Sequence, residues 1–188
     1  MQLSPFRAIA LVTGLGIALS AAAADPRAAR DRAIQDLDRA SGGTAHIELH
    51  QLTGAPRVIR LVPGSLELAG ATTEERSRSF LARYGQALGL VDAVRDLTSG
   101  RRFSDRFGHE HASFRQQHRG VPVFGAELRL HFAPGGELET VNGTVVPEID
   151  LPSVAPTVGA EEAAATAATL VRKQRNASGL RAEARGTM

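Results

Sequence analysis

The sequence predicts an α+β fold, and two patterns indicate this class. Apolar residues recur at helical spacing after residue 25 and again after residue 72, whereas apolar and polar residues alternate between residues 111 and 146 as they do in half-buried strands. Helices followed by a run of strands are typical of an antiparallel sheet covered by helices. The chain of 188 residues is 43% apolar, which is the composition of a globular protein, and it has no cysteine. Disulfides, thiolate nucleophiles and cysteine-bound metals are therefore excluded.

The first 24 residues have the pattern of a secretory signal peptide. Arg7 provides a positive charge, residues 8–20 are uncharged, and small residues at 21–24 precede Asp25. The uncharged run is too short to predict stable membrane insertion. We expect cleavage near Ala24 and a secreted or periplasmic chain. The predicted organisation is a signal peptide over 1–24, a first domain over 25–150, and a linker with an incomplete second domain over 151–188.

The beginning of the exported part predicts a helix and two strands. Asp25 can cap a helix that has Pro26 at its first position and ends near residues 41–43. Residues 45–51 then alternate strictly, and residues 57–62 resemble a second strand. We expect these strands to form a two-stranded unit with the helix.

The clearest helix signal follows at Thr72. Thr72 and Glu75 have the spacing of a capping box, and apolar residues continue at helical spacing through Phe80, Leu81 and Tyr84. Neighbouring carboxylates at Glu74 and Glu75 suit the first turn of this helix, where they interact favourably with its dipole, better than an acid–base pair.

Three strands are predicted after residue 101. They cover residues 111–118, 121–132 and 137–146, with Arg119-Gly120 as a turn between the first two. Five of the eight aromatic residues fall in this stretch, so we expect the main core here; they are Phe103, Phe107, Phe114, Phe124 and Phe132.

The last part predicts a proline-marked linker and one helix. Prolines stand at 147, 152 and 156, and a helix is expected to begin near Gly159, with Glu161 and Glu162 in its first turn. A solvated basic tail is expected from Arg172.

No catalytic, cofactor-binding or metal-binding residue is predicted. The His109-Glu110-His111 triplet departs from the zincin pattern, because a second histidine is needed at position 113, which is Ser. The alternating His46, Glu48 and His50 resemble the solvent face of a strand more than a metal site. Neither a nucleophile elbow nor a phosphate loop is present. A formal charge of +2 gives no reason to expect a nucleic-acid partner.

One block is more specific than these patterns. The segment Phe114–Glu127, together with Gly135–Glu137 and Val141–Pro147, closely resembles the pro-region of thermolysin-type secreted metalloproteases, in the part known as the fungalysin/thermolysin propeptide domain. Residues 156–163 resemble the start of the PepSY domain that follows in such precursors. With the helix after Thr72, the resemblance covers about residues 57–171.

The resemblance implies a binding function. Pro-regions of this family act as intramolecular chaperones and inhibitors, so the implied partner is the cognate metalloprotease domain, in cis or in trans. Zinc is expected only in that domain, since this chain has no HExxH motif and is no enzyme as given. We expect a truncated precursor whose cystatin-like PepSY domain is incomplete; a free-standing secreted protease inhibitor or peptide-binding module is the alternative.

The matching motif positions are expected to be structural or partner-binding. Gly120 would permit the turn, Pro122 would keep the backbone extended, Gly125 would allow a close approach or a bulge, and Gln116 would satisfy backbone groups. Asn142-Gly143 is expected in a turn or bulge. The full set is Phe114, Gln116, Gly120, Pro122, Val123, Phe124, Gly125, Asn142 and Gly143.

Overall fold

The computed structural model describes residues 25–175, and side chains through residue 173. The expected signal peptide and the residues after 175 lie outside this range. The elements are α1 (Pro26–Ala40), β1 (His46–Leu49), β2 (Pro56–Arg60), α2 (Thr73–Tyr84), the 3₁₀ turn η1 (Gly85–Leu88), α3 (Ala93–Asp96), β3 (Leu97–Ser104), β4 (Glu110–His118), β5 (Val121–Phe132), β6 (Leu138–Thr144) and α4 (Ala160–Arg175). Within residues 25–175, none of the helices is both long and apolar enough to cross a membrane.

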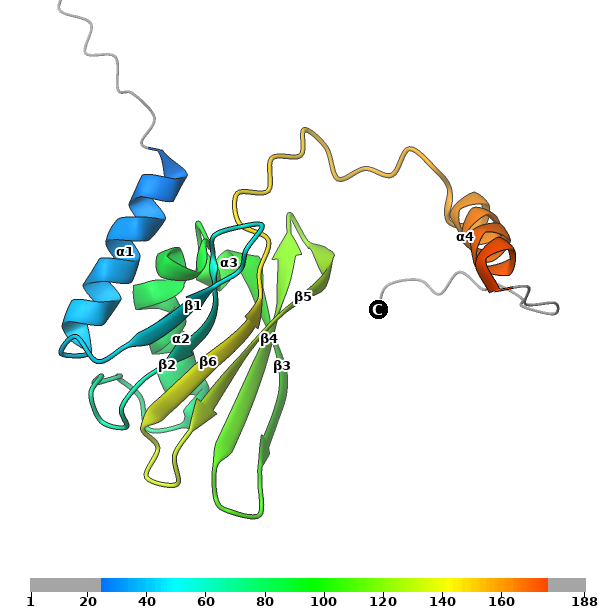
Figure 1. Cartoon of the computed structure of the whole chain (residues 1–188). Helices are drawn as coiled ribbons and strands as arrows, with labels where there is room; N and C mark the ends of the chain where they lie inside the picture. The colour runs from blue at the N-terminus through cyan, green and yellow to red at the C-terminus, as the bar shows by residue number, and fades with distance from the viewer. Residues whose placement is uncertain (1–24, 176–188) are drawn as a thin grey trace, which may run out of the picture.

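The α+β class is confirmed, with all six strands in one antiparallel sheet of order β1-β2-β6-β5-β4-β3. Helix α2 lies behind the sheet, and α1 packs against η1 (Figure 1). The expected pairing of β1 with β2 is confirmed, and this pair is part of the larger sheet, because β2 also pairs with β6 through Ile59 and Val141. A two-stranded hairpin alone is marginal in water, whereas joining the larger sheet buries Ile59 completely.

The two capped helices begin where the sequence predicts. The Asp25 carboxylate accepts a hydrogen bond from the backbone N–H of Arg27 at the start of α1. At α2 both bonds of the capping box form, since Thr72 Oγ1 accepts from the N–H of Glu75 and the Glu75 carboxylate accepts from the N–H of Thr72. Hydrogen bonds from the backbone N–H groups of Thr72 and Ala71 to the Glu75 carboxylate hold the pKa of Glu75 below its usual value.

The core lies between α2 with η1 and the inner face of the sheet. Of the five aromatics of the strand region, Phe114 and Phe132 are buried in it, whereas Phe103, Phe107 and Phe124 are exposed. The reason is the period of two along a strand, which sends alternate side chains to opposite faces, and the position of some aromatics in loops and bulges. The large buried core residues from the two layers are Phe80, Leu88, Phe114, Leu128, Leu130 and Phe132.

The C-terminal helix stands apart from the sheet at the end of an irregular segment over residues 145–159 (Figure 1). Glu161 and Glu162 occupy its first turn as expected. The helix continues to Arg175, so the residues from Arg172 to 175 are helical and not a tail. Leu170 and Val171 are exposed on it.

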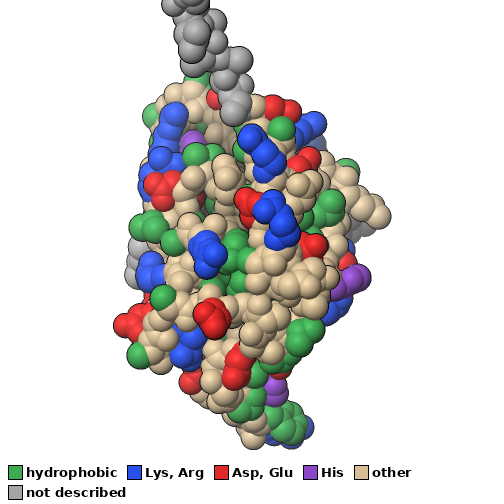
Figure 2. All heavy atoms as spheres, turned by 90° about the vertical axis from the view of Figure 1, so that its left-hand side faces the viewer, with side chains coloured by type: hydrophobic (Ala, Val, Ile, Leu, Met, Phe, Trp, Pro, Cys, Tyr) green, Lys and Arg blue, Asp and Glu red, His purple; other side chains and the backbone are tan. Residues whose placement is uncertain are grey.

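Surface charges are mixed on the face that carries α1. Arginine side chains and carboxylates are interspersed there without forming a continuous basic stripe (Figure 2). Several arginines are paired with neighbouring acidic groups, as Arg39 is with Asp36 and Arg60 with Glu48.

Candidate functional site: the β4–β5 hairpin and the segment after β6

The tip of the β4–β5 hairpin is a two-residue loop. His118 pairs with Val121, which leaves only Arg119 and Gly120 between the strands. Both residues have positive φ, 50° and 82°, which is the requirement of a type I′ turn. This turn matches the right-handed twist of the flanking strands, and glycine adopts it without strain. The position of Gly120 therefore follows from backbone geometry.

Next to the tip, β5 bulges away from β4. Arg115 pairs with Glu127 but Gln117 pairs with Pro122, so residues 123–126 stand opposite Gln116 alone. Gly125 has a φ of 73° inside this bulge, and no atom lies where its Cβ would be. The bulge leaves the Phe124 side chain fully exposed, at 102% relative exposure. A fully exposed phenylalanine has no role in this domain's core, which makes it a candidate contact residue.

Opposite the bulge, the Gln116 side chain holds the backbone of Val146. Gln116 is buried, its Nε2 donates to the carbonyl oxygen of Val146 at 2.8 Å, and its Oε1 accepts from the N–H of Val146 at 2.8 Å. These two bonds replace those that a neighbouring strand would make, because β6 ends at Thr144. We call this pair of bonds the Gln116 clasp.

Two further contacts tie down the segment that the clasp begins. The buried Arg30 of α1 reaches the Glu148 carboxylate, with 3.4 Å between Nη1 and Oε1. Arg119 at the hairpin tip donates to the carbonyl oxygen of Pro152 at 3.3 Å. We call residues 145–152 the strap, since three separate parts of the domain hold it.

Between the strap and the hairpin tip lies an apolar groove of about 360 Å³. Glu148 and Asp150 are the charged groups at its rim, and His118 is its one imidazole. The apolar lining comes from both walls: Val121, Pro122 and Val123 of β5, and Ile149, Leu151 and Val154 of the strap and beyond. A groove of this composition suits apolar side chains of a partner.

The remaining motif residues lie inside the sheet. The expected turn or bulge at Asn142-Gly143 is wrong, because both residues are in regular register in β6, opposite Arg129 and Leu128 of β5. A Cβ at Gly143 would collide with the carbonyl oxygen of Glu127, so glycine permits the close approach of the two strands. The Asn142 carboxamide oxygen lies 3.2 Å from Nε2 of His131.

The two histidine sets differ in their surroundings. Glu48 is held by Arg60 at 2.7 Å as well as by His46 at 3.6 Å, and the hydrogen bond from Arg60 lowers the pKa of Glu48. His109 precedes β4, where it lies 3.6 Å from Glu139, whereas His111 lies in β4. Within the described residues, no group of three or more histidine and acidic side chains is arranged to hold a metal ion.

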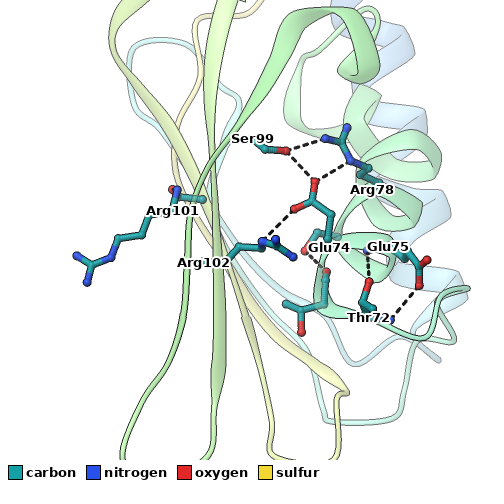
Figure 3. A network of polar contacts seen from close by, with 10 residues as sticks. Thr72, Glu74, Glu75, Arg78, Ser99, Arg101 and Arg102 are labelled. Carbon is teal, nitrogen blue, oxygen red and sulfur yellow. Dashed lines mark hydrogen bonds and ion pairs between the residues drawn. The ribbon is translucent and has the colours of Figure 1, made fainter.

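Glu74 has a structural role that its sequence position did not reveal. Its carboxylate receives Arg78 Nε at 2.8 Å and Ser99 Oγ at 2.7 Å, and Arg102 Nε lies 3.5 Å away. The network joins α2 to β3, while Arg101 points to the other side of the strand (Figure 3). These three partners, from α2 and β3, make the Glu74 carboxylate a link between the helix and the strand.

The hairpin, the bulge and the glycine contact of β6 belong to one recognised unit. Residues 97–145, which form β3 to β6, match the Fungalysin/Thermolysin Propeptide Motif. The chain thus carries a protease propeptide motif, and the resemblance seen in residues 114–147 is confirmed.

The chain is also similar in sequence to individual proteases of the thermolysin type. The chain is 34% identical over 91 residues to thermolysin from Alicyclobacillus acidocaldarius subsp. acidocaldarius and to thermolysin from Bacillus caldolyticus. It is 33% identical over 91 residues to the thermostable neutral protease NprT of Geobacillus stearothermophilus. Each match covers 47% of this chain and 16% of the relative, so the similar region spans about a sixth of the relatives' length. No solved structure matches the chain.

Proposed function

We propose that the chain is the pro-region of a secreted thermolysin-type metalloprotease precursor and acts as intramolecular chaperone and inhibitor of its catalytic domain. The observation that carries the proposal is the match of β3–β6 to the propeptide motif, in a fold that leaves Phe124 exposed beside an apolar groove. The partner is the cognate protease domain, and the zinc of that domain would be the only cofactor.

The proposal includes a division of the chain. Residues 1–24 are the export signal, residues 25–150 form the propeptide domain, and residues 151–188 are a linker with the start of a cystatin-like PepSY domain. The isolated position of α4 supports this division, as do its exposed Leu170 and Val171. A single helix cannot bury its own apolar side, so these residues would be covered by the rest of that domain.

The chaperone role has a physical basis in the coupling between binding and folding. A partner that binds the native protease but not the unfolded one stabilises the native state by mass action. Tethering the partner to the same chain raises its effective concentration to roughly millimolar. Cleavage of the connection then removes this stabilisation and releases the enzyme.

The motif residues divide into a structural set and a set that is free to contact a partner. In the structural set, Phe114 and Gln116 are buried, and Gly120, Gly125 and Gly143 have positive φ values that favour glycine. Pro122, Val123 and Phe124 lie on the bulged side of β5, beside or in the groove. We assign the contact with the protease to this second set.

The test uses a denatured thermolysin-type protease and the purified chain. We expect the chain to raise the yield of active enzyme on refolding and to inhibit the folded enzyme. Phe124→Ala should weaken both effects. Phe107→Ala is the matched control, because Phe107 is also exposed but lies in the β3–β4 hairpin loop. An unchanged refolding yield with and without the chain would contradict the chaperone role.

The alternative is a free-standing inhibitor or peptide-binding module, and the apolar groove favours it as a second candidate. Such a module would inhibit the folded protease without raising the refolding yield. The same two measurements therefore distinguish the two functions.

A further inference from the structure

A chain of polar side chains crosses the outer face of the sheet, on the side away from α2. Nδ1 of His111 on β4 lies 2.7 Å from Nδ1 of His131 on β5. At the outer ends, His111 Nε2 is 3.3 Å from Asp105 Oδ2, and His131 Nε2 is 3.2 Å from Asn142 Oδ1. The four side chains connect the β3–β4 loop, β4, β5 and β6.

The partners constrain where the protons lie. The Asn142 oxygen can only accept, so His131 Nε2 carries a proton, and in the neutral ring His131 Nδ1 keeps its lone pair. The 2.7 Å contact then requires His111 Nδ1 to donate. His111 Nε2 faces the Asp105 carboxylate. The central contact thus depends on a lone pair on one of the two rings, and the contact with Asn142 places that lone pair on His131.

Two neighbours hold the His111 ring in place. The Phe103 and His111 rings are tilted by 35° with their centroids 4.6 Å apart, and the Asp105 carboxylate lies 3.3 Å from His111 Nε2. Hydrogen bonds from the backbone N–H groups of Phe107 and His109 and from His111 outweigh the effect of burial and lower the pKa of Asp105, which keeps its carboxylate charged beside His111.

At His131 the neutral form is favoured. Burial lowers the pKa of His131, and the positive charges of His111 and Arg129 lower it further, against the opposing effects of Asn142 and Glu139. The other charged or titratable groups that line this face are Arg101 of β3, His109 beside Glu139, and Glu127 of β5.

We propose that the His111–His131 pair is a pH-sensitive latch, which holds β4, β5 and β6 together while His131 is neutral and opens when both imidazoles are protonated. Two imidazolium rings have no lone pair to share, so the central hydrogen bond is lost and two like charges remain in contact. A histidine in the unfolded chain protonates at about pH 6.5. Because the pKa of folded His131 is lower, the unfolded state takes up the proton first, and stability is lost as the pH falls below about 6.5.

The biological consequence rests on the proposed function. An acidic compartment or medium would loosen the motif's sheet and weaken the pro-region's hold on the protease. The latch itself is a property of this chain and is tested without any protease.

The first test is urea unfolding of the purified chain at about pH 7.5 and about pH 5. We expect the urea midpoint of the wild type to fall more on acidification than that of His131→Gln, which keeps a polar side chain that does not titrate. His46→Gln is the control, because His46 is exposed on β1, and it should fall as much as the wild type. An equal fall in His131→Gln and the wild type would overturn the proposal.

The second test needs no variant, so it stands even if His131→Gln fails to fold. Nuclear magnetic resonance of the imidazole nitrogens should show His131 neutral at about pH 7.5, with its proton on Nε2. The His131 signals should titrate below about pH 6.5. A His131 proton on Nδ1, or titration at the ordinary value, would refute the latch.

Discussion

The Gln116 clasp predicts a large stability loss from a single substitution, Gln116→Ala. The change removes two hydrogen bonds of 2.8 Å and leaves the N–H and carbonyl of Val146 without partners in a partly buried place. Each bond contributes about 1 kcal/mol net, and unsatisfied backbone groups add a desolvation cost, so we expect a loss of roughly 2–4 kcal/mol in the free energy of unfolding. That loss corresponds to a fall on the order of 10 °C in Tm for a domain of this size.

Urea denaturation measures the loss, and a neighbouring glutamine provides the control. The Gln117 amide donates one bond, to the carbonyl oxygen of Arg95, and that contact is exposed. We expect Gln117→Ala to cost less than about 1 kcal/mol. Gln116→Glu should be almost as damaging as Gln116→Ala, because its carboxylate would face the carbonyl oxygen of Val146. If Gln116→Ala costs no more than Gln117→Ala, the clasp does not stabilise the domain.

Three further outcomes are expected. Gly143→Ala should destabilise by more than about 3 kcal/mol in urea unfolding, since the added Cβ collides with the carbonyl oxygen of Glu127, and a loss under about 1 kcal/mol would contradict the close approach. Phe124→Ser should change the free energy of unfolding by less than about 0.5 kcal/mol, because the ring is fully exposed, and a larger loss would show that it packs in the domain. Proteinase K should cut first between the strap and α4, within residues 153–159, as read by intact mass; first cuts before Pro152 would show that the strap is loose.

The helices and the β4–β5 hairpin could be predicted from the sequence, because caps, strand alternation and turn residues each act over only a few neighbouring residues. The caps at Asp25 and Thr72 bond to backbone groups two or three positions away. The two faces of residues 126–132 follow from the period of a strand, and the turn at Gly120 follows from the allowed φ of glycine.

Long-range features could not be predicted in the same way. The β2–β6 pairing depends on which strand edge remains free, and residue patterns within β2 do not contain that information. The β3 strand was missed because Ser99, Gly100 and Arg101 are small or polar and the strand is an edge, with little apolar alternation. The contact between His111 and His131 depends on the register across the β5 bulge. A shift by one residue would send these side chains to opposite faces.

The contacts of the strap also set the length of the free connection between the sheet domain and α4. Because Arg119 holds Pro152, only seven residues, 153–159, are free to span the distance to α4, and fully extended they reach about 25 Å. If the strap were released back to Val146, thirteen residues, 147–159, would be free and the reach would be about 45 Å. Doubling a flexible connection lowers the local concentration of whatever it carries by about threefold. A few hydrogen bonds at the surface of one domain thus adjust how often the next part of the chain encounters it.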